Sequence, residues 1–384
     1  MVVNRMILNE TGYFGKGAIT EVANEAKKRG FKKALVVTDK DLLKFEVATK
    51  VITILQEADL AYEIFDGIVP NPTIEDVQAG VAACKAAKAD YIVAIGGGSP
   101  IDTAKAIGII IENPEFFDVI SLEGTAATKK PSLPILAVPT TSGTAAEVTI
   151  NYVITDAKNH RKFVCVDPHD IPVVAFVDSD MMMGMPKSLC AATGMDALTH
   201  AIEGFVTKGA WEMSDMLHIK AIEIIANSLR QSFAGDQSAR EAMALGQYIA
   251  GMGFSNVGLG LVHGMAHPLS AWYNIPHGVA CATLLPLIMD YNKDFTGEKY
   301  REIAEKFNIP GADQLPLSEV REKAVSAVKQ LGIDVGIPQN LTELGVKKED
   351  IPQIAKDALK DVTTPGNPRE TTVEEIITLY NDML

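Results

Sequence analysis

The sequence predicts an α/β amino-terminal half followed by an all-helical carboxyl-terminal half. Short apolar, β-rich runs alternate with helical segments as far as Asp178, and after that point only helical periodicity continues. At about 150 residues per domain, a chain of 384 residues is long enough for two domains. The run MMMGMP interrupts both patterns, so we predict domains at 1–185 and 186–384.

The first half has the pattern of parallel βαβ units. Its apolar runs, which suit strands buried on both faces, are Ala34–Thr38, Ala61–Phe65, Tyr91–Ile95, Leu133–Val138 and Pro172–Asp178. Helices are expected over Leu42–Ala58 and Ile74–Ala87. Two further runs, Val148–Thr155 and Lys162–Val166, flank a polar turn and predict a hairpin added to the sheet.

The second half carries helical periodicity throughout. The predicted helices are Leu189–Thr207, Asp215–Phe233, Ala239–Phe254, His277–Asn292, Leu317–Leu331, Ile351–Leu359 and Val373–Leu384. The methionines before them are interpreted as adaptable packing residues at a domain boundary.

Composition excludes several functions. The net charge of −14, without a Lys/Arg cluster, argues against nucleic-acid binding. No run of about 18 apolar residues predicts a membrane span, and the first residues, MVVNRMILNE, lack the apolar core of a signal peptide. The four cysteines are widely spaced without a CxxC pair, which suits reduced thiols. We therefore expect a cytoplasmic enzyme.

A glycine-rich loop follows the strongest predicted strand and precedes a helix. In Gly96-Gly97-Gly98-Ser99-Pro100 the glycines allow close approach of a ligand, and the helix amino terminus presents N–H groups to a phosphate. Ser99 is expected to cap this helix. A turn without a ligand is the alternative.

A second polar loop supports a dinucleotide site. Thr140, Thr141 and Thr144 follow the next apolar strand, and ligands of open α/β sheets collect at the carboxyl ends of strands. Asp39 ends the first strong strand, where a carboxylate can bind ribose hydroxyls and repel a 2′-phosphate. The glycines at 12, 15 and 17 precede that strand, so the standard Rossmann GxGxxG order is absent.

Histidines and one aspartate in the second half indicate a metal site. Asp196 and His200 are four residues apart on a predicted helix, which puts both on one face. His263, His267 and His277 follow in apolar surroundings. Imidazole with carboxylate is common ligand chemistry for borderline metals. Spacing alone leaves open whether His263, His267 or both bind metal.

Other polar residues are assigned more simply. Glu203 lies one turn beyond His200 and is either an acceptor for a ligand's second ring nitrogen or an ordinary helix-face glutamate. His160, His169 and His218 lie outside this cluster and are expected to be structural or exposed.

Two long segments then decide the ligand set. Ala175–Glu203 and Gly258–Gly278 resemble the two signatures of the iron-containing (group III) alcohol dehydrogenases, and GGGSPIDTAKA and PTTSGTAAE resemble that family's cofactor loops. The resemblance implies a dehydroquinate synthase-like fold, Fe²⁺ (with Zn²⁺ as the other candidate) and NAD(H). It implies metal ligation by Asp196, His200, His263 and His277, with His267 aiding proton transfer.

The same resemblance implies the remaining sites. The expected cofactor contacts are Asp39, Asn71, Gly97, Gly98, Ser99, Thr140, Thr141, Thr144 and Lys162, and the expected pocket residues are Asn151, Phe254 and Val362. Further segments such as DGIVPNPTI and RKFVCVDPHDIP resemble a subgroup that interconverts lactaldehyde and 1,2-propanediol. A homodimer or larger homo-oligomer is implied. The alternatives are a zinc-dependent polyol dehydrogenase of the same superfamily and a non-catalytic nucleotide-binding protein.

Overall fold

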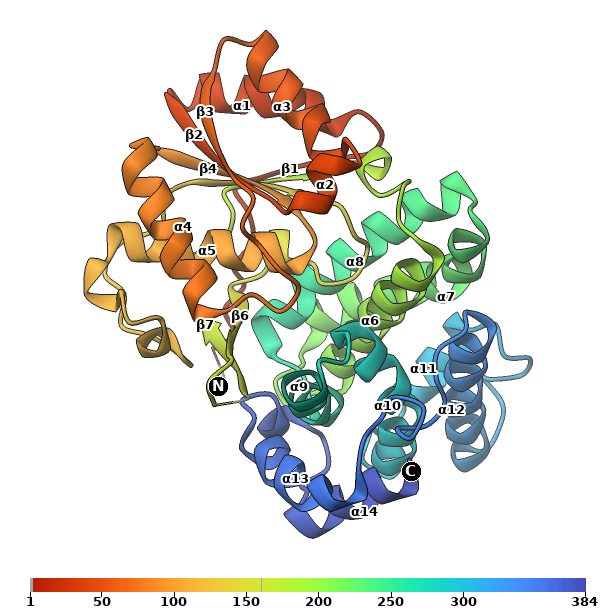
Figure 1. The fold of residues 1–384 in the computed structure, drawn as a ribbon. Coiled ribbons are helices and arrows are strands. Elements are labelled where there is room, and N and C mark those ends of the chain that lie inside the picture. The colour runs from red at the N-terminus through yellow and green to blue at the C-terminus, as the bar shows by residue number, and fades with distance from the viewer. Residues whose placement is uncertain (1–2, 160) are drawn as a thin grey trace. The chain divides into compact units, whose positions relative to one another are not determined.

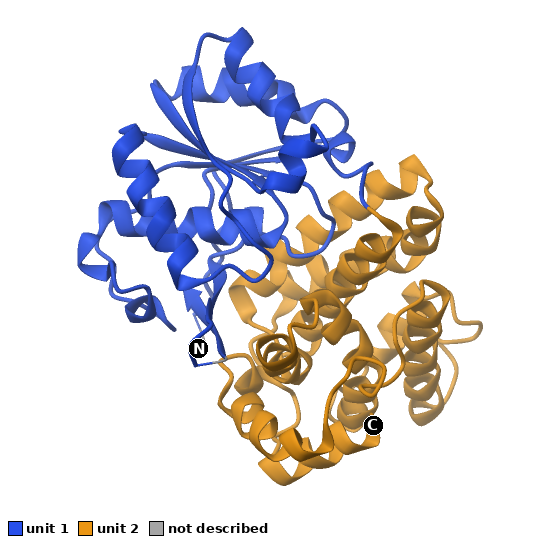
Figure 2. Cartoon of the chain, in the orientation of Figure 1, with its two compact units in different colours: residues 1–185 blue, residues 186–384 orange. Residues whose placement is uncertain are grey.

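The computed structural model describes residues 3–159 and 161–384. The chain divides into two compact units, of which unit 1 ends at Met185 and unit 2 spans Pro186–Leu384 (Figure 2). His160, expected to be structural or exposed, lies outside the described residues.

Unit 1 is built on a parallel sheet, as predicted. Its strands are β1 (Thr11–Phe14), β2 (Lys33–Val37), β3 (Ala61–Phe65), β4 (Tyr91–Gly96), β5 (Ile135–Pro139) and β8 (Val174–Val177). Among the described residues their order is β1-β8-β5-β4-β2-β3, and all neighbours pair in parallel. The strand β1 was not predicted, because a short, glycine-containing and partly exposed segment lacks an apolar run.

Helices cover both faces of this sheet. The helices of unit 1 are α1 (Val22–Lys28), α2 (Lys40–Lys44), α3 (Val47–Glu57), α4 (Ile74–Ala87) and α5 (Gly98–Glu112). Figure 1 shows α1 and α3 on one side and α4 and α5 on the other. Alternate residues of β2 enter the two cores: Leu35 packs in the core with α4 and α5, and Val36 in the core with α1 and α3.

Two predictions about the helices and strands of unit 1 were wrong. The helix expected over Leu42–Ala58 is broken, because Glu46 takes a left-handed conformation with φ 59° between α2 and α3. The hairpin of β6 (Asn151–Asp156) and β7 (Arg161–Val166) is antiparallel as expected, but forms a separate two-stranded sheet. It packs along α5 instead of adding to the main sheet.

The buried Lys105 ties this hairpin to α5. Its Nζ donates hydrogen bonds to the carbonyl oxygen of Thr149 (2.7 Å), to the Thr149 hydroxyl (2.9 Å) and to the carbonyl oxygen of Asn151 (2.8 Å). These three acceptors satisfy all three donors of the ammonium group, which offsets part of the cost of burying it.

Unit 2, all of whose residues are described, contains helices and no strand. The helices are α6 (Lys187–Val206), α7 (Glu212–Ala234), α8 (Gln237–Val257), α9 (Leu261–Tyr273), α10 (His277–Asn292), α11 (Lys299–Lys306), α12 (Leu317–Asp334), α13 (Ile351–Lys360) and α14 (Val373–Asp382). They enclose one apolar core. No helix in the described part of the chain has the length and hydrophobicity needed to cross a membrane.

Candidate metal centre and cofactor loops

Three helices of unit 2 each present two chemically active side chains one turn apart. Helix α6 carries Asp196 and His200, α9 carries His263 and His267, and α10 carries His277 and Cys281. Every residue of α6 from Cys190 to Val206 is buried, so its polar side chains need partners from neighbouring helices.

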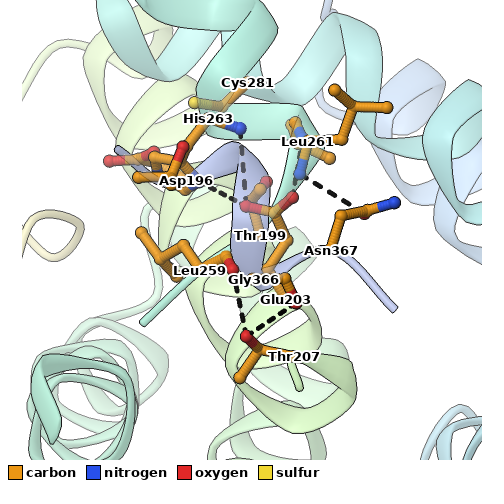
Figure 3. A network of polar contacts seen from close by, with 12 residues as sticks. Asp196, Thr199, Glu203, Thr207, Leu259, Leu261, His263, Cys281, Gly366 and Asn367 are labelled. Atoms are coloured by element: carbon orange, nitrogen blue, oxygen red, sulfur yellow. Dashed lines mark hydrogen bonds and ion pairs between the residues drawn. The ribbon is translucent and has the colours of Figure 1, made fainter. Parts of the chain in front are cut away.

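The donor atoms of three of the four predicted ligands converge. Oδ1 of Asp196 lies 3.9 Å from Nε2 of His263 and 3.8 Å from Nε2 of His277. Asp196, His263, His277 and Cys281 each place one donor atom within 4.8 Å of the others. Figure 3 shows Asp196, His263 and Cys281 of this group. Helices α6 and α10 come close enough for this because Gly278 has no side chain. A Cβ at Gly278 would lie only 2.5 Å from the Ala192 carbonyl oxygen of α6.

His200 borders this group. Its ring stacks on His263 with centroids 4.6 Å apart and on Phe254 with centroids 4.2 Å apart. Phe254, a predicted pocket residue on α8, thus covers a predicted ligand. The group of donor atoms that lie within 4.8 Å of one another includes Sγ of Cys281, and His200 is not a member of it.

Glu203 holds His263 and the start of α9. Its Oε2 lies 2.6 Å from Nδ1 of His263, and its Oε1 accepts a 2.6 Å hydrogen bond from the backbone N–H of Val262. The N–H of Leu261 is bonded to Asn367 (Figure 3). Since Gly260 has no side chain to cap α9, these two residues satisfy its first N–H groups. Glu203 is therefore the ring-nitrogen acceptor, not an ordinary surface glutamate.

The Glu203 contact sets the tautomer of His263. A carboxylate only accepts hydrogen bonds, so Nδ1 carries the proton and Nε2 offers its lone pair to the cluster. Burial alone would lower the pKa of His263, but the hydrogen bond and the charges of Glu203, Asp196 and Asp361 raise it above its ordinary value. The site therefore attracts positive charge.

The residues present fit a metal ion. Nε2 of His263 is buried and has no hydrogen-bond partner among the described residues, although it faces the carboxylate and imidazole donors. A buried nitrogen lone pair without a donor is costly. A divalent cation bound by nitrogen and oxygen atoms would satisfy it.

His267 has a different environment from His263. Its Nδ1 lies 2.7 Å from Oδ2 of Asp361, at the end of α13. Its ring stacks on that of His277 with centroids 5.2 Å apart. Val362, a predicted pocket residue, follows Asp361 and is 51% exposed.

In unit 1 three of the predicted cofactor residues follow neighbouring strands of the main sheet. Asp39, Gly97 and Thr140 follow β2, β4 and β5, which are neighbours in the sheet. Two threonines of the second loop contact the glycine loop: a Cβ on Gly97 would lie 3.2 Å from Thr141, and one on Gly98 would lie 3.0 Å from Thr144. The two loops therefore meet, as expected.

Ser99 does not cap α5, contrary to the prediction. The helix begins at Gly98, two residues earlier than a cap at Ser99 requires, so the capping position belongs to Gly97, which has no side chain. The serine lies inside the first turn, and its carbonyl oxygen accepts a hydrogen bond from the Thr103 hydroxyl. The first N–H groups of α5 consequently have no side-chain cap.

The other cofactor and pocket residues of unit 1 are placed as follows. Asp39 caps α2, and its Oδ1 accepts a 2.8 Å hydrogen bond from the Leu42 N–H. Asn71 lies between β3 and α4 with φ 58°, and Lys162 lies on β7. Asn151, a predicted pocket residue, begins β6 and is held through its carbonyl oxygen by Lys105.

The comparisons with known proteins agree with this architecture. The family model for iron-containing alcohol dehydrogenases matches residues 9–179. A second family model, for the C-terminal part of the Fe-containing alcohol dehydrogenase family, matches residues 190–384. The chain belongs to the iron-containing alcohol dehydrogenase family, which confirms the resemblance inferred from the signatures.

Individual relatives match over nearly the whole chain. Lactaldehyde reductase of Escherichia coli (strain K12) is 63% identical over 380 residues, covering 99% of each chain. NAD-dependent methanol dehydrogenase of Bacillus methanolicus is 39% identical over 374 residues, covering 96% of this chain and 97% of the relative. The crystal structure of a 1,3-propanediol oxidoreductase superposes with a TM-score of 0.96 at 41% identity, covering 100% of both chains.

Sequence reasoning missed two residues of the site. Cys281 follows His277 by four residues on a predicted helix, a spacing that could have revealed it. Asp361 is 94 residues from His267 and has no local signal.

Proposed function

We propose that this protein is a metal-dependent NAD(H) alcohol dehydrogenase that interconverts lactaldehyde and 1,2-propanediol. The proposal rests on the convergence of Asp196, His263 and His277 in a chain 63% identical to a lactaldehyde reductase. These three residues are also among the four for which the resemblance to the family signatures implies metal ligation.

The proposed ligands are Asp196, His200, His263 and His277, and the proposed metal is Fe²⁺, with Zn²⁺ as the other candidate. A divalent cation bound there would polarise a carbonyl oxygen or lower the pKa of an alcohol. Glu203 supports this use of His263, because its hydrogen bond to Nδ1 leaves Nε2 to face the other donors.

His267 is the proposed proton carrier. The Asp361 carboxylate keeps the proton on Nδ1 and fixes the ring, so Nε2 is the atom that exchanges a proton with the substrate oxygen or with water. An imidazole suits this task because it can both donate and accept a proton near neutral pH.

The proposed dinucleotide site lies at the sheet edge of unit 1. The proposed contacts are Asp39, Asn71, Gly97, Gly98, Ser99, Thr140, Thr141, Thr144 and Lys162. The absence of a side-chain cap on α5 supports a phosphate at its amino terminus. The Asp39 carboxylate favours NAD(H), since it repels a 2′-phosphate.

A small aldehyde or alcohol is the proposed substrate, with Asn151, Phe254 and Val362 as proposed pocket residues. We also propose a homodimer or larger homo-oligomer. A cytoplasmic location is supported by the cysteines: all four are buried, and none, in the described part of the chain, forms a disulfide.

A substrate panel on anaerobically purified protein tests the proposal. We expect one metal ion per chain, and faster oxidation of NADH than of NADPH with lactaldehyde. Glycerol and NAD⁺ test the zinc polyol alternative, and preferential activity with them would replace the proposed substrate. No oxidation of NADH by any short aldehyde in metal-loaded protein would leave the non-catalytic alternative.

A further inference from the structure

Cys281 lies at the candidate metal centre and has no role in the proposed function. It is fully buried on α10, one turn after His277, and its Sγ is 3.6 Å from Nε2 of His277. It belongs to the group whose donor atoms all lie within 4.8 Å of one another. Figure 3 draws it beside His263 and Asp196.

A second observation shows that the thiol faces a ligand position. The Nε2 atom of His263, a residue only 2% exposed, has no hydrogen-bond partner among the described residues. It lies 3.9 Å from the Asp196 carboxylate, which is also 3.8 Å from Nε2 of His277. The sulfur therefore borders a group of potential metal-ligand atoms, one of which, Nε2 of His263, has no hydrogen-bond partner among the described residues.

The spacing of these atoms suits a tetrahedral ion. With Zn–S of about 2.3 Å and Zn–N of about 2.0 Å, two donors of a tetrahedral site lie about 3.5 Å apart. The Cys281 to His277 separation of 3.6 Å matches this value, and the two Asp196 separations of 3.9 and 3.8 Å need only small side-chain shifts. Six-coordinate sites need shorter separations between adjacent donors.

We propose that Cys281 is an alternative fourth protein ligand, which completes an Asp196–His263–His277–Cys281 site for Zn²⁺ or Co²⁺. The proposal rests on the proposed function, since it assumes that a metal binds these residues. On binding, the thiol releases its proton to solvent and the thiolate bonds to the ion. Thiolate is a soft ligand that favours zinc over harder ions such as Mn²⁺.

The alternative set has a consequence for the ion's accessibility. Four protein ligands around a tetrahedral zinc ion make a closed site, whereas catalytic sites retain an open position. Both four-ligand sets therefore bind substrate only where the ion accepts a fifth ligand, and they differ in whether His200 or Cys281 is the fourth protein ligand. The choice between them depends on the metal supplied.

Cobalt spectroscopy distinguishes a ligand from a packed thiol. The full-length protein is stripped of metal with a chelator, loaded anaerobically with Co²⁺ and analysed for bound cobalt and for near-ultraviolet thiolate-to-cobalt charge transfer. The variant is Cys281→Ser. The matched control is Cys190→Ser, because Cys190 is also fully buried in unit 2 but contacts the Ser232 hydroxyl at 3.4 Å.

We expect the charge-transfer band in the wild type and in Cys190→Ser, and its loss in Cys281→Ser with cobalt still bound. Bound cobalt without the band in the wild type, or a band that persists in Cys281→Ser, overturns the inference and leaves the proposed function standing. A protein that binds no cobalt overturns both.

Metal affinity gives a second readout that requires no turnover. By chelator competition, Cys281→Ser should weaken Zn²⁺ binding by at least about 10-fold, the lower end of the effect of removing a supporting residue. Mn²⁺ binding should change much less, because manganese prefers oxygen ligands. Equal losses for both ions would contradict a direct bond from sulfur.

Discussion

The Nδ1 atom of His267 lies 2.7 Å from Oδ2 of Asp361, a residue 94 positions away in the chain. The other carboxylate oxygen of Asp361 accepts hydrogen bonds from the N–H and the hydroxyl of Thr363. Burial alone would raise the pKa of Asp361, but His267 and Thr363 lower it below its ordinary value. The carboxylate is thus fixed, ionised and aimed at one imidazole nitrogen.

Asp361→Asn should lower kcat with little change in KM. An amide has only one acceptor atom for the three donors that Asp361 serves, so the orientation of His267 is lost. We expect a decrease of about 10-fold or more, because the variant loses part of the roughly 10²–10⁴-fold that positioned proton transfer contributes. Steady-state kinetics across pH measure it, and the basic limb of the profile should also shift.

A control for this variant is Asp357→Asn. Asp357 lies on the same helix, and its carboxylate accepts a 3.2 Å hydrogen bond from Trp272 on the surface. This substitution should leave kcat and the pH profile unchanged. Equal losses in both variants would mean that the effect comes from α13 and not from His267.

His263 and His267 should separate metal binding from turnover. His263→Ala removes a nitrogen of the buried cluster, so metal and activity should be lost together. His267→Ala should retain about one metal ion per chain and lose most of its turnover. Metal analysis of the two purified variants decides the assignment, and the reverse pattern would exchange the two roles.

Glu203→Gln should weaken metal binding without removing a ligand. Glutamine keeps one acceptor oxygen and has a donor NH₂ group in place of the other, so either Nδ1 of His263 or the N–H of Val262 then faces a second donor. We expect metal affinity to fall by about 10- to 100-fold, measured by chelator competition. Glu241→Gln, at an exposed position of α8, is the control. An unchanged affinity in Glu203→Gln would argue against its orienting role.

Asp39→Asn should relax the choice of cofactor while preserving α2. Asparagine is as good a helix cap as aspartate, so the bond from the Leu42 N–H is retained and only the charge is removed. We expect the NADPH to NADH ratio of kcat/KM to rise by about 10-fold, which corresponds to about 1.4 kcal/mol. Asp39→Ala, which removes both charge and cap, should also be less stable by about 1 kcal/mol.

Asp102→Asn should change stability in a pH-dependent manner. Burial raises the pKa of Asp102 from 3.8 to about 6, although Lys105 and the Val153 N–H oppose the shift. Between pH 4 and 6 the unfolded chain therefore binds fewer protons than the folded one, and the wild type loses stability as pH rises. Above pH 6 the loss is constant.

The asparagine variant avoids this loss because it has no charge to bury. Its free energy of unfolding, relative to the wild type, should increase between pH 4 and 6 by up to about 3 kcal/mol, since one pKa unit corresponds to about 1.4 kcal/mol. Urea unfolding at pH 4, 5, 6 and 7.5 measures this. A difference that is the same at pH 4 and 7.5 would contradict the burial of an ionised Asp102.

The regular part of the fold was predictable because its signals are local. The strand β3 (Ala61–Phe65), although it is a partly exposed edge strand, and the helix α4 (Ile74–Ala87), which begins with a capping box, have the predicted bounds. The break at Glu46 and the separation of the hairpin from the main sheet were not predictable. They depend on a left-handed residue and on the tertiary anchor at Lys105.

The residues of the candidate site also divide into those with a local sequence signal and those without one. The pair on α6 was visible as residues four apart on a predicted helix, and one of the two interpretations of Glu203 was correct. No helix was predicted over α9 (Leu261–Tyr273), which contains Pro268, so the roles of His263 and His267 stayed open on spacing alone. Asp361 depends on the contact of α13 with α9, which no local pattern encodes. Cys281 carried a visible spacing, but an isolated cysteine in an apolar helix is ordinarily a packing residue.

The paired arrangement on α6, α9 and α10 bears on how such a centre changes during evolution. Each helix offers a donor and a neighbouring position one turn away that faces the same interior. A point substitution at the neighbouring position can therefore add or remove a donor without moving the backbone. Metal preference can drift among descendants of one scaffold by single mutations, while the packing that assembles the three helices is inherited intact.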